Sequence, residues 1–280
     1  MVKTYNSAWN FLAASLPLLL EKEAENNLIL GIAETLQRDI KYYGDQPPLL
    51  ISVHLDDRCI CCCLQTPPKN LIIYADEGQL NRSIPELCNY LAVNNVEIPG
   101  IIGPRDTVLQ FNDRWTSIKQ VSATVRFNQM VYKLEKLTEV PMSPGKMRQA
   151  LPIDLDTVTD WIHQFHLEAL GQSSFEEARK QADKKIQEGA IYLWETDQPV
   201  SMAGWTRPTQ NGVTIAFVYT PEEHRKKGYA TSCVAQLTKL MLEQYRFCSL
   251  FTDLNNPTSN SIYQKMGYQP KGHVLQCAFD

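Results

Sequence analysis

The chain has 280 residues, of which 44% are hydrophobic, with 27 Lys and Arg against 31 Asp and Glu. This length suits about two domains with buried cores, while the modest charge excludes a disordered chain and provides no basic face for nucleic acid. No apolar run approaches the roughly 20 residues that span a bilayer, and the most apolar stretch, residues 11–20, contains Ser15 and Pro17 and follows no basic leader. We therefore expect a soluble protein with neither a membrane nor a nucleic acid as partner.

The first half alternates between helical and extended patterns. Apolar residues recur at helical spacing in two early segments, and apolar runs bounded by turn residues follow them. In chain order, these patterns predict helices over residues 6–25 and 27–40, strands over 49–55, 59–66 and 70–75, a helix over 84–93 with Pro85 in its first turn, a strand over 96–102, a helix over 106–115 and a strand over 121–137.

The second half follows a turn or linker rich in Pro, Ser and Gly at residues 141–145. Ser174 and Glu177 form a capping box that starts a helix. In chain order, we predict a strand over 147–151, helices over 155–170 and 174–189, strands over 191–195, 200–206 and 213–219, a helix over 228–246, a strand over 248–253, a helix over 257–266 and a strand from 268.

Both halves share one order of elements: two helices, three strands, a helix, a strand, a helix and a strand. No sequence repeat accompanies this order, so a single large α/β sheet is the alternative. We expect an internal duplication, with two similar α/β domains built on mixed sheets and covering residues 1–142 and 146–280.

Eight cysteines occur in the chain, and four of them crowd into residues 59–63. Cys59 and Cys62 have a C-x-x-C spacing, but no second ligand pair follows, and a structural zinc site needs one. Residues 59–64 instead read as a buried strand in which cysteine serves as a small apolar residue. So many thiols without a disulfide framework favour a reducing compartment. We expect a cytoplasmic protein without a bound metal.

The most informative stretch is residues 218–230, which read VYTPEEHRKKGYA. It lies between a predicted strand and a long helix, whose first backbone N–H groups lack intrahelical partners and attract an anion. Gly228 lets the backbone approach a phosphate closely, and the small Ala230 keeps the first turn clear. Positive residues surround the loop: His224, Arg225, Lys226 and Lys227. The alternative is a glycine turn with a solvated basic cluster.

A second group of polar residues follows the next strand, in residues 253–268. Asn256 can cap a short helix that has Pro257 at its first position. Asn260 and Tyr263 are three residues apart and therefore share one helix face. That face offers an amide and a phenol, which suit hydrogen bonding to an amide-containing chain and proton donation. The alternative is an exposed helix with ordinary polar residues.

Together the two stretches resemble the GNAT superfamily of acyl-coenzyme A (CoA) N-acyltransferases. The pattern R-x-x-G-x-A at residues 225–230 is similar to the family's pyrophosphate motif, and Asn260 with Tyr263 before Met-Gly-Tyr at 266–268 is similar to its later motif. The resemblance covers residues 147–280. Two longer strings, Val-Tyr-Thr-Pro at 218–221 and residues 252–263, resemble a bacterial subgroup of predicted acetyltransferases. In that subgroup an N-terminal GNAT-like domain precedes the catalytic one, and Gln-Thr-Pro-Pro at 65–68 is similar to a segment of it. The implied fold is two tandem GNAT-like domains, the first degenerate.

The resemblance also implies roles for the matching residues. Strand residues near Val218 and Thr220 would pair with the pantetheine arm and polarise the thioester carbonyl. Asn255 and Asn260 would fix the pantetheine, and Tyr263 would protonate the departing thiolate. The acetyl-CoA pyrophosphate would be held by Arg225, Lys226, Lys227, Gly228, Tyr229 and Ala230.

The implied reaction is direct transfer of an acetyl group from acetyl-CoA to a primary amine in a ternary complex. Many family members carry a glutamate base on the strand before the loop, but residues 213–218 contain no acid. Asp253 is the tentative base, Glu195 and Glu168 are weaker candidates, and a water relay is a further alternative. A catalytically silent module that binds or senses acyl-CoA is the rival function.

The first half has no equivalent of the loop motif. Its counterpart is expected within residues 76–83, which hold two acids and one glycine but no R-x-x-G-x-A pattern. Carboxylates repel a pyrophosphate, so we expect this half not to bind CoA. The sequence leaves open the amine, the acyl chain length and the oligomeric state.

Overall fold

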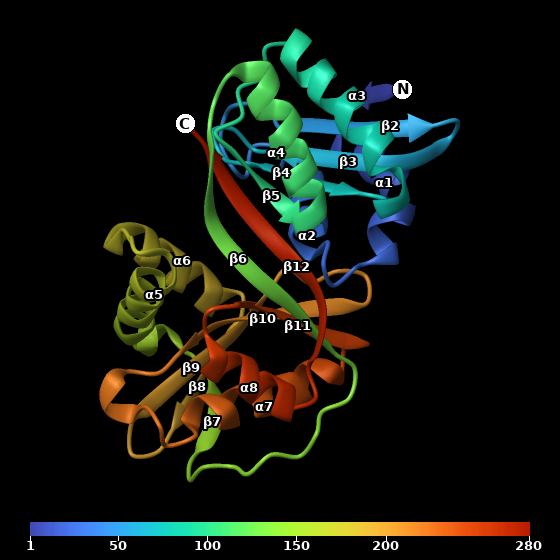
Figure 1. Cartoon of the computed structure of the whole chain (residues 1–280). Helices are drawn as coiled ribbons and strands as arrows, with labels where there is room; N and C mark the ends of the chain where they lie inside the picture. The colour runs from blue at the N-terminus through green and yellow to red at the C-terminus, as the bar shows by residue number, and fades with distance from the viewer. The chain divides into compact units, whose positions relative to one another are not determined.

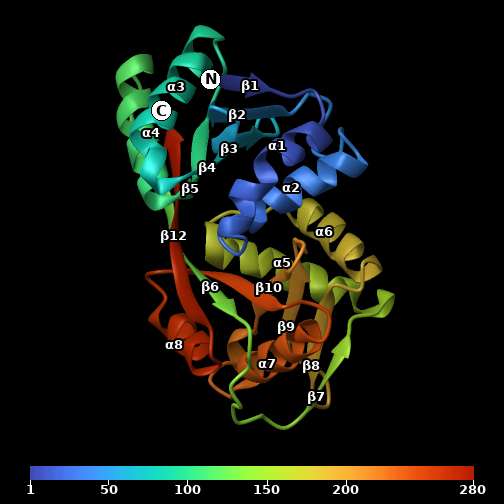
Figure 2. The ribbon, with the colours of Figure 1, turned by 90° about the vertical axis from the view of Figure 1, so that its right-hand side faces the viewer.

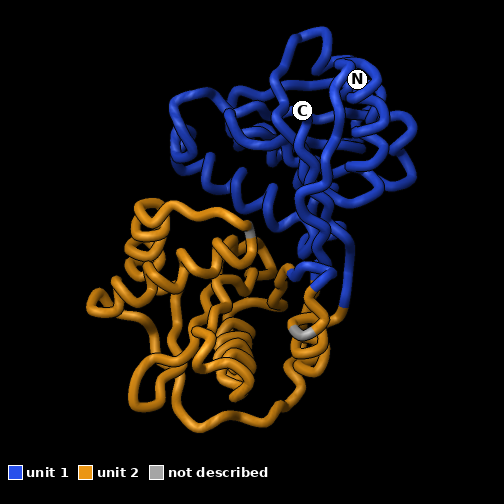
Figure 3. Tube along the Cα trace, turned by 60° about the vertical axis from the view of Figure 1, so that its left-hand side comes forward, with its two compact units in different colours: residues 1–131, 252–255, 270–280 blue, residues 132–251, 256–269 orange. Residues whose placement is uncertain are grey.

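The computed structural model describes residues 1–169, 171–257 and 259–280 and divides into two compact units (Figure 3). Unit 1 comprises Met1–Val131, Thr252–Asn255 and Pro270–Asp280, and unit 2 comprises Tyr132–Phe251 and Asn256–Gln269. These bounds differ from the predicted domains 1–142 and 146–280. The physical reason is strand pairing, because the C-terminal residues 274–278 pair with residues 100–104 of the first half.

The predicted order of elements is present in both halves (Figure 1). The first half contains β1 (Val2–Thr4), α1 (Ala8–Glu21), α2 (Asn27–Arg38), β2 (Leu49–Leu55), β3 (Arg58–Gln65), β4 (Leu71–Ala75), the 3-10 turn η1 (Glu77–Gln79), α3 (Leu80–Val93), β5 (Gly100–Pro104), α4 (Arg105–Lys119) and β6 (Ala123–Leu134). Of these, β1 was not expected. With it, the order matches that of the second half throughout.

The second half repeats the series with its own strands and helices. It contains β7 (Lys146–Gln149), the 3-10 turn η2 (Pro152–Asp154), α5 (Leu155–Leu170), α6 (Phe175–Gln187), β8 (Ile191–Glu195), β9 (Pro199–Thr206), β10 (Gly212–Tyr219), the 3-10 turn η3 (Glu222–His224), α7 (Tyr229–Leu242), β11 (Phe247–Asp253), α8 (Pro257–Lys265) and β12 (Gln269–Phe279). The prediction of an α/β chain with a repeated element order is confirmed.

Some predicted boundaries are wrong. Helix α3 begins at Leu80, so Pro85 lies inside the helix and not in its first turn. The reason is that η1, capped by the Asp76 side chain, leads directly into the helix. Helix α7 ends at Leu242, four positions before the predicted residue 246.

In unit 1 the strands follow the order β1-β2-β3-β4-β5-β12-β6. The pair β4 and β5 is parallel, whereas β5 pairs with β12 in the antiparallel direction. Helices α1 and α2 cover one face of the sheet, and α3 and α4 cover the other (Figures 1 and 2). Each face therefore has its own buried apolar cluster.

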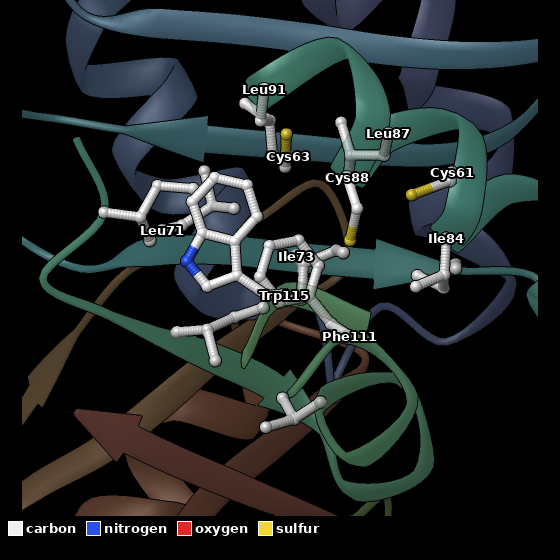
Figure 4. Close-up of a cluster of buried hydrophobic side chains, with 14 of the residues drawn as sticks. Cys61, Cys63, Leu71, Ile73, Ile84, Leu87, Cys88, Leu91, Phe111 and Trp115 are labelled. Carbon is white, nitrogen blue, oxygen red and sulfur yellow. The ribbon is translucent and has the colours of Figure 1, made fainter. Parts of the chain in front are cut away.

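The cysteines of β3 belong to these two clusters. All eight cysteines of the chain are free and buried. Cys61 and Cys63 pack toward Cys88 of α3 (Figure 4), while Cys62 faces the α1–α2 side. A bulge places Ile60 between the paired positions, so Cys59 also faces the α1–α2 side. The prediction that this stretch is a buried strand is confirmed.

In unit 2 the strands follow the order β11-β10-β9-β8-β7, and β10 and β11 form the parallel pair. This arrangement repeats the β5-β4-β3-β2-β1 order of unit 1. Helices α5 and α6 pack on one face through an apolar cluster that includes Val158, Ile162 and Phe217. Helix α7 packs on β8, β9 and β10 from the other face (Figure 2).

Candidate functional site

Strand β10 changes its course near its C-terminal end. Its pairing with β9 shifts register between Ala216 and Tyr219, and Phe217 has a φ of 54°, which a bulky side chain rarely adopts. On the other side, the pairing with β11 covers only Gly212–Thr214, although β10 continues to Tyr219. The C-terminal part of β10, including the half-buried Val218, therefore has backbone groups that β11 does not pair with.

The loop between β10 and α7 is shaped for an anion. Lys226 has a φ of 62° and Gly228 a φ of 80°, and such left-handed turns direct successive N–H groups into one concavity. Gly228 is the N-cap of α7 and supplies no side chain to the helix. The first N–H groups of α7, which include those of Tyr229 and Ala230, therefore have neither an intrahelical partner nor a side-chain cap.

The linker before β7 supports this loop. The Ser143 hydroxyl donates to the Lys227 carbonyl oxygen at 2.7 Å, and the Ser143 N–H donates to the Ser232 hydroxyl at 2.8 Å. Ser232 in turn donates to the Gly228 carbonyl oxygen at 3.1 Å. A Cβ atom at position 228 would lie 2.6 Å from the Ser143 hydroxyl oxygen, so the position requires glycine. The sequence reasoning missed Ser143.

Arg225 is turned toward α5. Its Nη2 atom lies 2.5 Å from Oε1 of Glu168, and its Nε atom donates to the Thr220 carbonyl oxygen at 2.9 Å. The guanidinium carbon lies 5.8 Å from the centre of the Tyr219 ring. The hydrogen bond that Arg225 donates to Glu168 raises the pKa of Arg225. Lys226 and Lys227 are exposed, so the loop carries positive charge at its surface.

Helix α8 presents the predicted amide and phenol. The Asn256 side chain accepts from the Ser259 N–H at 3.1 Å, which confirms the cap. Asn260 and Tyr263 lie on this helix and are half-buried. Burial raises the pKa of Tyr263 to about 12. The phenol is therefore protonated at neutral pH and can donate a proton.

The carboxylates considered as bases have different surroundings. Asp253 ends β11 and accepts from the Asn255 N–H at 2.7 Å, and both residues belong to unit 1, whereas the loop and Tyr263 belong to unit 2. Glu195 accepts from Arg148 at 3.0 Å and therefore has a structural partner. Glu168 is the carboxylate that contacts Arg225 of the loop.

Comparison with known proteins identifies this part of the chain. The model of the acetyltransferase (GNAT) family matches residues 155–268, which contain β10, the loop, α7 and α8. This segment is a GNAT acetyltransferase domain. Acyl transfer is the chemistry of the family, and acetyl-CoA is its typical donor. The GNAT resemblance of the two motifs is thereby confirmed.

Solved structures extend the likeness to the whole chain. A GNAT-family acetyltransferase from Colwellia psychrerythraea has 15% identity, 100% coverage of both chains and a TM-score of 0.58. A GCN5-related N-acetyltransferase from Sphaerobacter thermophilus has 15% identity, covers 99% of this chain and 94% of its own, and has a TM-score of 0.63. A tandem GNAT protein from the clavulanic acid biosynthesis pathway has 10% identity, coverage of 99% and 97%, and a TM-score of 0.57. These likenesses show the fold, two GNAT-like domains in tandem.

No curated protein matches the chain. Within the described ranges, no helix combines the length and apolar character that crossing a bilayer requires. The same residues contain no group of three or more His, Cys, Asp or Glu placed to hold a metal ion.

Proposed function

We propose that the protein is an N-acetyltransferase that moves an acetyl group from acetyl-CoA to a primary amine. The observation that carries the proposal is the N-terminus of α7, which has no side-chain cap and follows a loop with left-handed Lys226 and Gly228. A pyrophosphate bound there gains several N–H donors and the positive end of the helix dipole. The bulged end of β10 precedes this loop and supports the same proposal.

In the proposed complex, the loop residues Arg225 to Ala230 hold the pyrophosphate. The backbone near Val218 and Thr220 pairs with the pantetheine arm, and Asn255 and Asn260 hold its amides. A β10 backbone N–H next to the thioester carbonyl stabilises the oxyanion that forms on attack.

The proposed reaction forms one bond and breaks another. The amine nitrogen attacks the thioester carbon, the C–N bond forms and the C–S bond breaks. The thiolate takes the proton of the Tyr263 hydroxyl, and the nitrogen loses a proton to Asp253 or through water. No residue of 213–218 is acidic, so the usual strand glutamate of the family is missing.

Calorimetric titration of the full chain with acetyl-CoA, followed by a thiol-release assay with a panel of amines, tests this function. We expect binding with one acetyl-CoA per chain and amine-dependent release of CoA. Binding without any amine-dependent release would favour the rival function, a silent acyl-CoA-binding module. Absence of binding would overturn both.

The proposal also covers the first half and the compartment. We propose that residues 1–142 carry a degenerate domain that does not bind CoA, because its loop holds Asp76 and Glu77 in place of the basic motif. The eight free cysteines support a reducing compartment such as the cytoplasm.

A further inference from the structure

The side chain of Arg225 fills a small cation-binding site formed by α5 and the end of β10. Three groups surround its guanidinium: the Glu168 carboxylate, the Thr220 carbonyl oxygen and the ring face of Tyr219. Each of them attracts any cation, since two are oxygen acceptors and the third is an aromatic face. The site is therefore not specific to a guanidinium.

Arg225 is only weakly held in this site. The side chains of Arg225 and Glu168 are 41% and 53% exposed. An exposed ion pair contributes at most a factor of about 5 to an equilibrium. Arg225 is also the first residue of the pyrophosphate loop, and a guanidinium binds phosphate oxygens through paired hydrogen bonds. A pyrophosphate bound to the loop therefore competes with Glu168 for the same side chain.

Two aromatic rings of α5 lie beside aromatic rings of β10, one of which is Tyr219. The ring of Trp161 lies 6.2 Å from that of Tyr219, and the ring of Phe165 lies 6.3 Å from that of Phe217 at the β10 bulge. Burial raises the pKa of Tyr219, and the carboxylates of Glu168 and Asp160 raise it further. The site thus combines negative charge with apolar surface, which suits an ammonium group on an apolar substituent.

We propose that Arg225 occupies the place of the acceptor's ammonium group until the acyl donor binds. This scheme rests on the proposed function. The pyrophosphate binds the Arg225 side chain, which then leaves Glu168 and the Tyr219 ring. These two groups bind a primary ammonium carried by an apolar or aromatic group. Glu168 is thus a binding residue for the acceptor. Donor and acceptor bind with positive coupling, because the donor vacates the acceptor's site.

The first experiment measures CoA binding to the full chain by calorimetry at fixed ionic strength. Glu168→Gln removes the competitor for Arg225, so CoA should bind up to about 5-fold more tightly. The matched control is Glu176→Gln, which removes an exposed carboxylate paired with Lys180 and should leave the CoA affinity unchanged. An unchanged affinity in Glu168→Gln would overturn the competition.

The second experiment uses benzylammonium as the acceptor probe and measures its binding with and without saturating CoA. We expect up to about 5-fold tighter binding with CoA, loss of that gain in Glu168→Gln, and tighter CoA-independent binding in Arg225→Met. Equal affinity in both states, or no binding in either, would overturn the inference. A wild-type chain that binds no CoA would instead overturn the proposed function, so the two failures are distinguishable.

Discussion

The two halves of the chain build the same strand–turn–helix unit, but the turns that lead into α3 and α7 differ. Between β4 and α3 the turn has only residues 76–79, and the Asp76 carboxylate accepts the Gly78 N–H at 3.0 Å. Between β10 and α7 the loop covers residues 220–228, and Gly228 provides no side-chain cap. Neither α3 nor α7 has a side-chain cap, so the difference lies in the turn, where the first half places a carboxylate and the second half a glycine.

The charges at the two turns have opposite signs. In unit 1 the acids lie on the turn: Asp76 pairs with Arg58 at 3.0 Å, and Glu77 pairs with Lys22 at the end of α1. In unit 2 the basic Arg225 lies on the loop, and its acidic partner Glu168 lies near the end of α5. Reversing the sign removes the attraction for a pyrophosphate while keeping an ion pair between turn and helix.

The parallel strand pair is short in both halves. In the first half, β4 pairs with β5 at Leu71 and Ile72, and a Cβ atom on Gly103 of β5 would lie 2.4 Å from the Ile73 carbonyl oxygen. In the second half, pairing stops at Thr214 and Ser249. The two halves thus differ in the charge of the turn and not in the parallel strand pair, and we expect the carboxylates of the first half to repel a pyrophosphate.

Gly228→Asp should have the largest effect on acetyl-CoA binding. It places a carboxylate in the loop before α7, as Asp76 does in the turn before α3. A carboxylate about 4 Å from a phosphate charge opposes it by about 4 kcal/mol at an effective dielectric of 20, a loss on the order of 10³-fold. Calorimetry of the full chain should therefore detect no acetyl-CoA binding. Gly78→Asp in the first half is the matched control and should leave one acetyl-CoA bound per chain.

A Gly228→Asp variant that binds acetyl-CoA normally would contradict the anion site. Loss of binding in Gly78→Asp would contradict the view that the first half does not bind the donor.

Tyr263→Phe should have the next largest effect. The corresponding helix of the first half, α4, buries Phe111 and Trp115, whereas α8 presents a phenol with a protonated hydroxyl. Removing this hydroxyl should lower kcat by about 10²-fold with a nearly unchanged KM for acetyl-CoA, as steady-state kinetics will show. In the matched control, Tyr268→Phe removes a hydroxyl bonded to Thr238 at 2.8 Å and should lower stability but not kcat.

If Tyr263→Phe retained full kcat, another group or water would have to protonate the thiolate. Loss of acetyl-CoA binding would make Tyr263 a structural contact instead.

The pH dependence of kcat should show a smaller effect of the same tyrosine. Its protonated form is the active one, and burial raises its pKa from 10.0 to about 12. Because a raised pKa keeps the group protonated to higher pH, kcat should not decline as the pH rises from 8 to 10. A decline of kcat centred at pH 10, the ordinary tyrosine pKa, would contradict the raised pKa if Tyr263→Phe abolished that decline.

The sequence predicts the elements whose signals are local. Helical spacing, caps and the loop motif locate α5, α7, α8 and the loop between β10 and α7, because each depends on residues close in the chain. Strand β1 was not predicted, because a strand of three residues, Val2–Thr4, is too short to show a periodic pattern. The pairing of β12 could not be predicted for another reason. Residues 274–278 have the pattern of a strand, but a local pattern does not indicate that residues 100–104 are the partner strand.

The same limit applies to the supports of the site. The contact between Ser143 and Lys227 joins residues 84 positions apart, and that between Arg225 and Glu168 joins residues 57 apart. A fragment that begins at residue 146 would lack Ser143 and would leave β12 without β5. Measurements of acetyl-CoA binding therefore need the full chain.

Ser143→Ala should have the smallest effect on acetyl-CoA binding, and it tests whether Ser143 shapes the loop before α7. It removes one hydrogen bond to the Lys227 carbonyl oxygen, a contribution of about 1 kcal/mol, so Kd for acetyl-CoA should rise by about 5-fold with kcat unchanged at saturation. Gly228→Ala should weaken binding further, because its Cβ meets the Ser143 hydroxyl oxygen at 2.6 Å. In the double variant that contact is gone, so the combined loss in affinity should be smaller than the product of the two single losses. Calorimetric titration of the four proteins measures this coupling, and strictly multiplicative losses would show that Ser143 does not shape the loop.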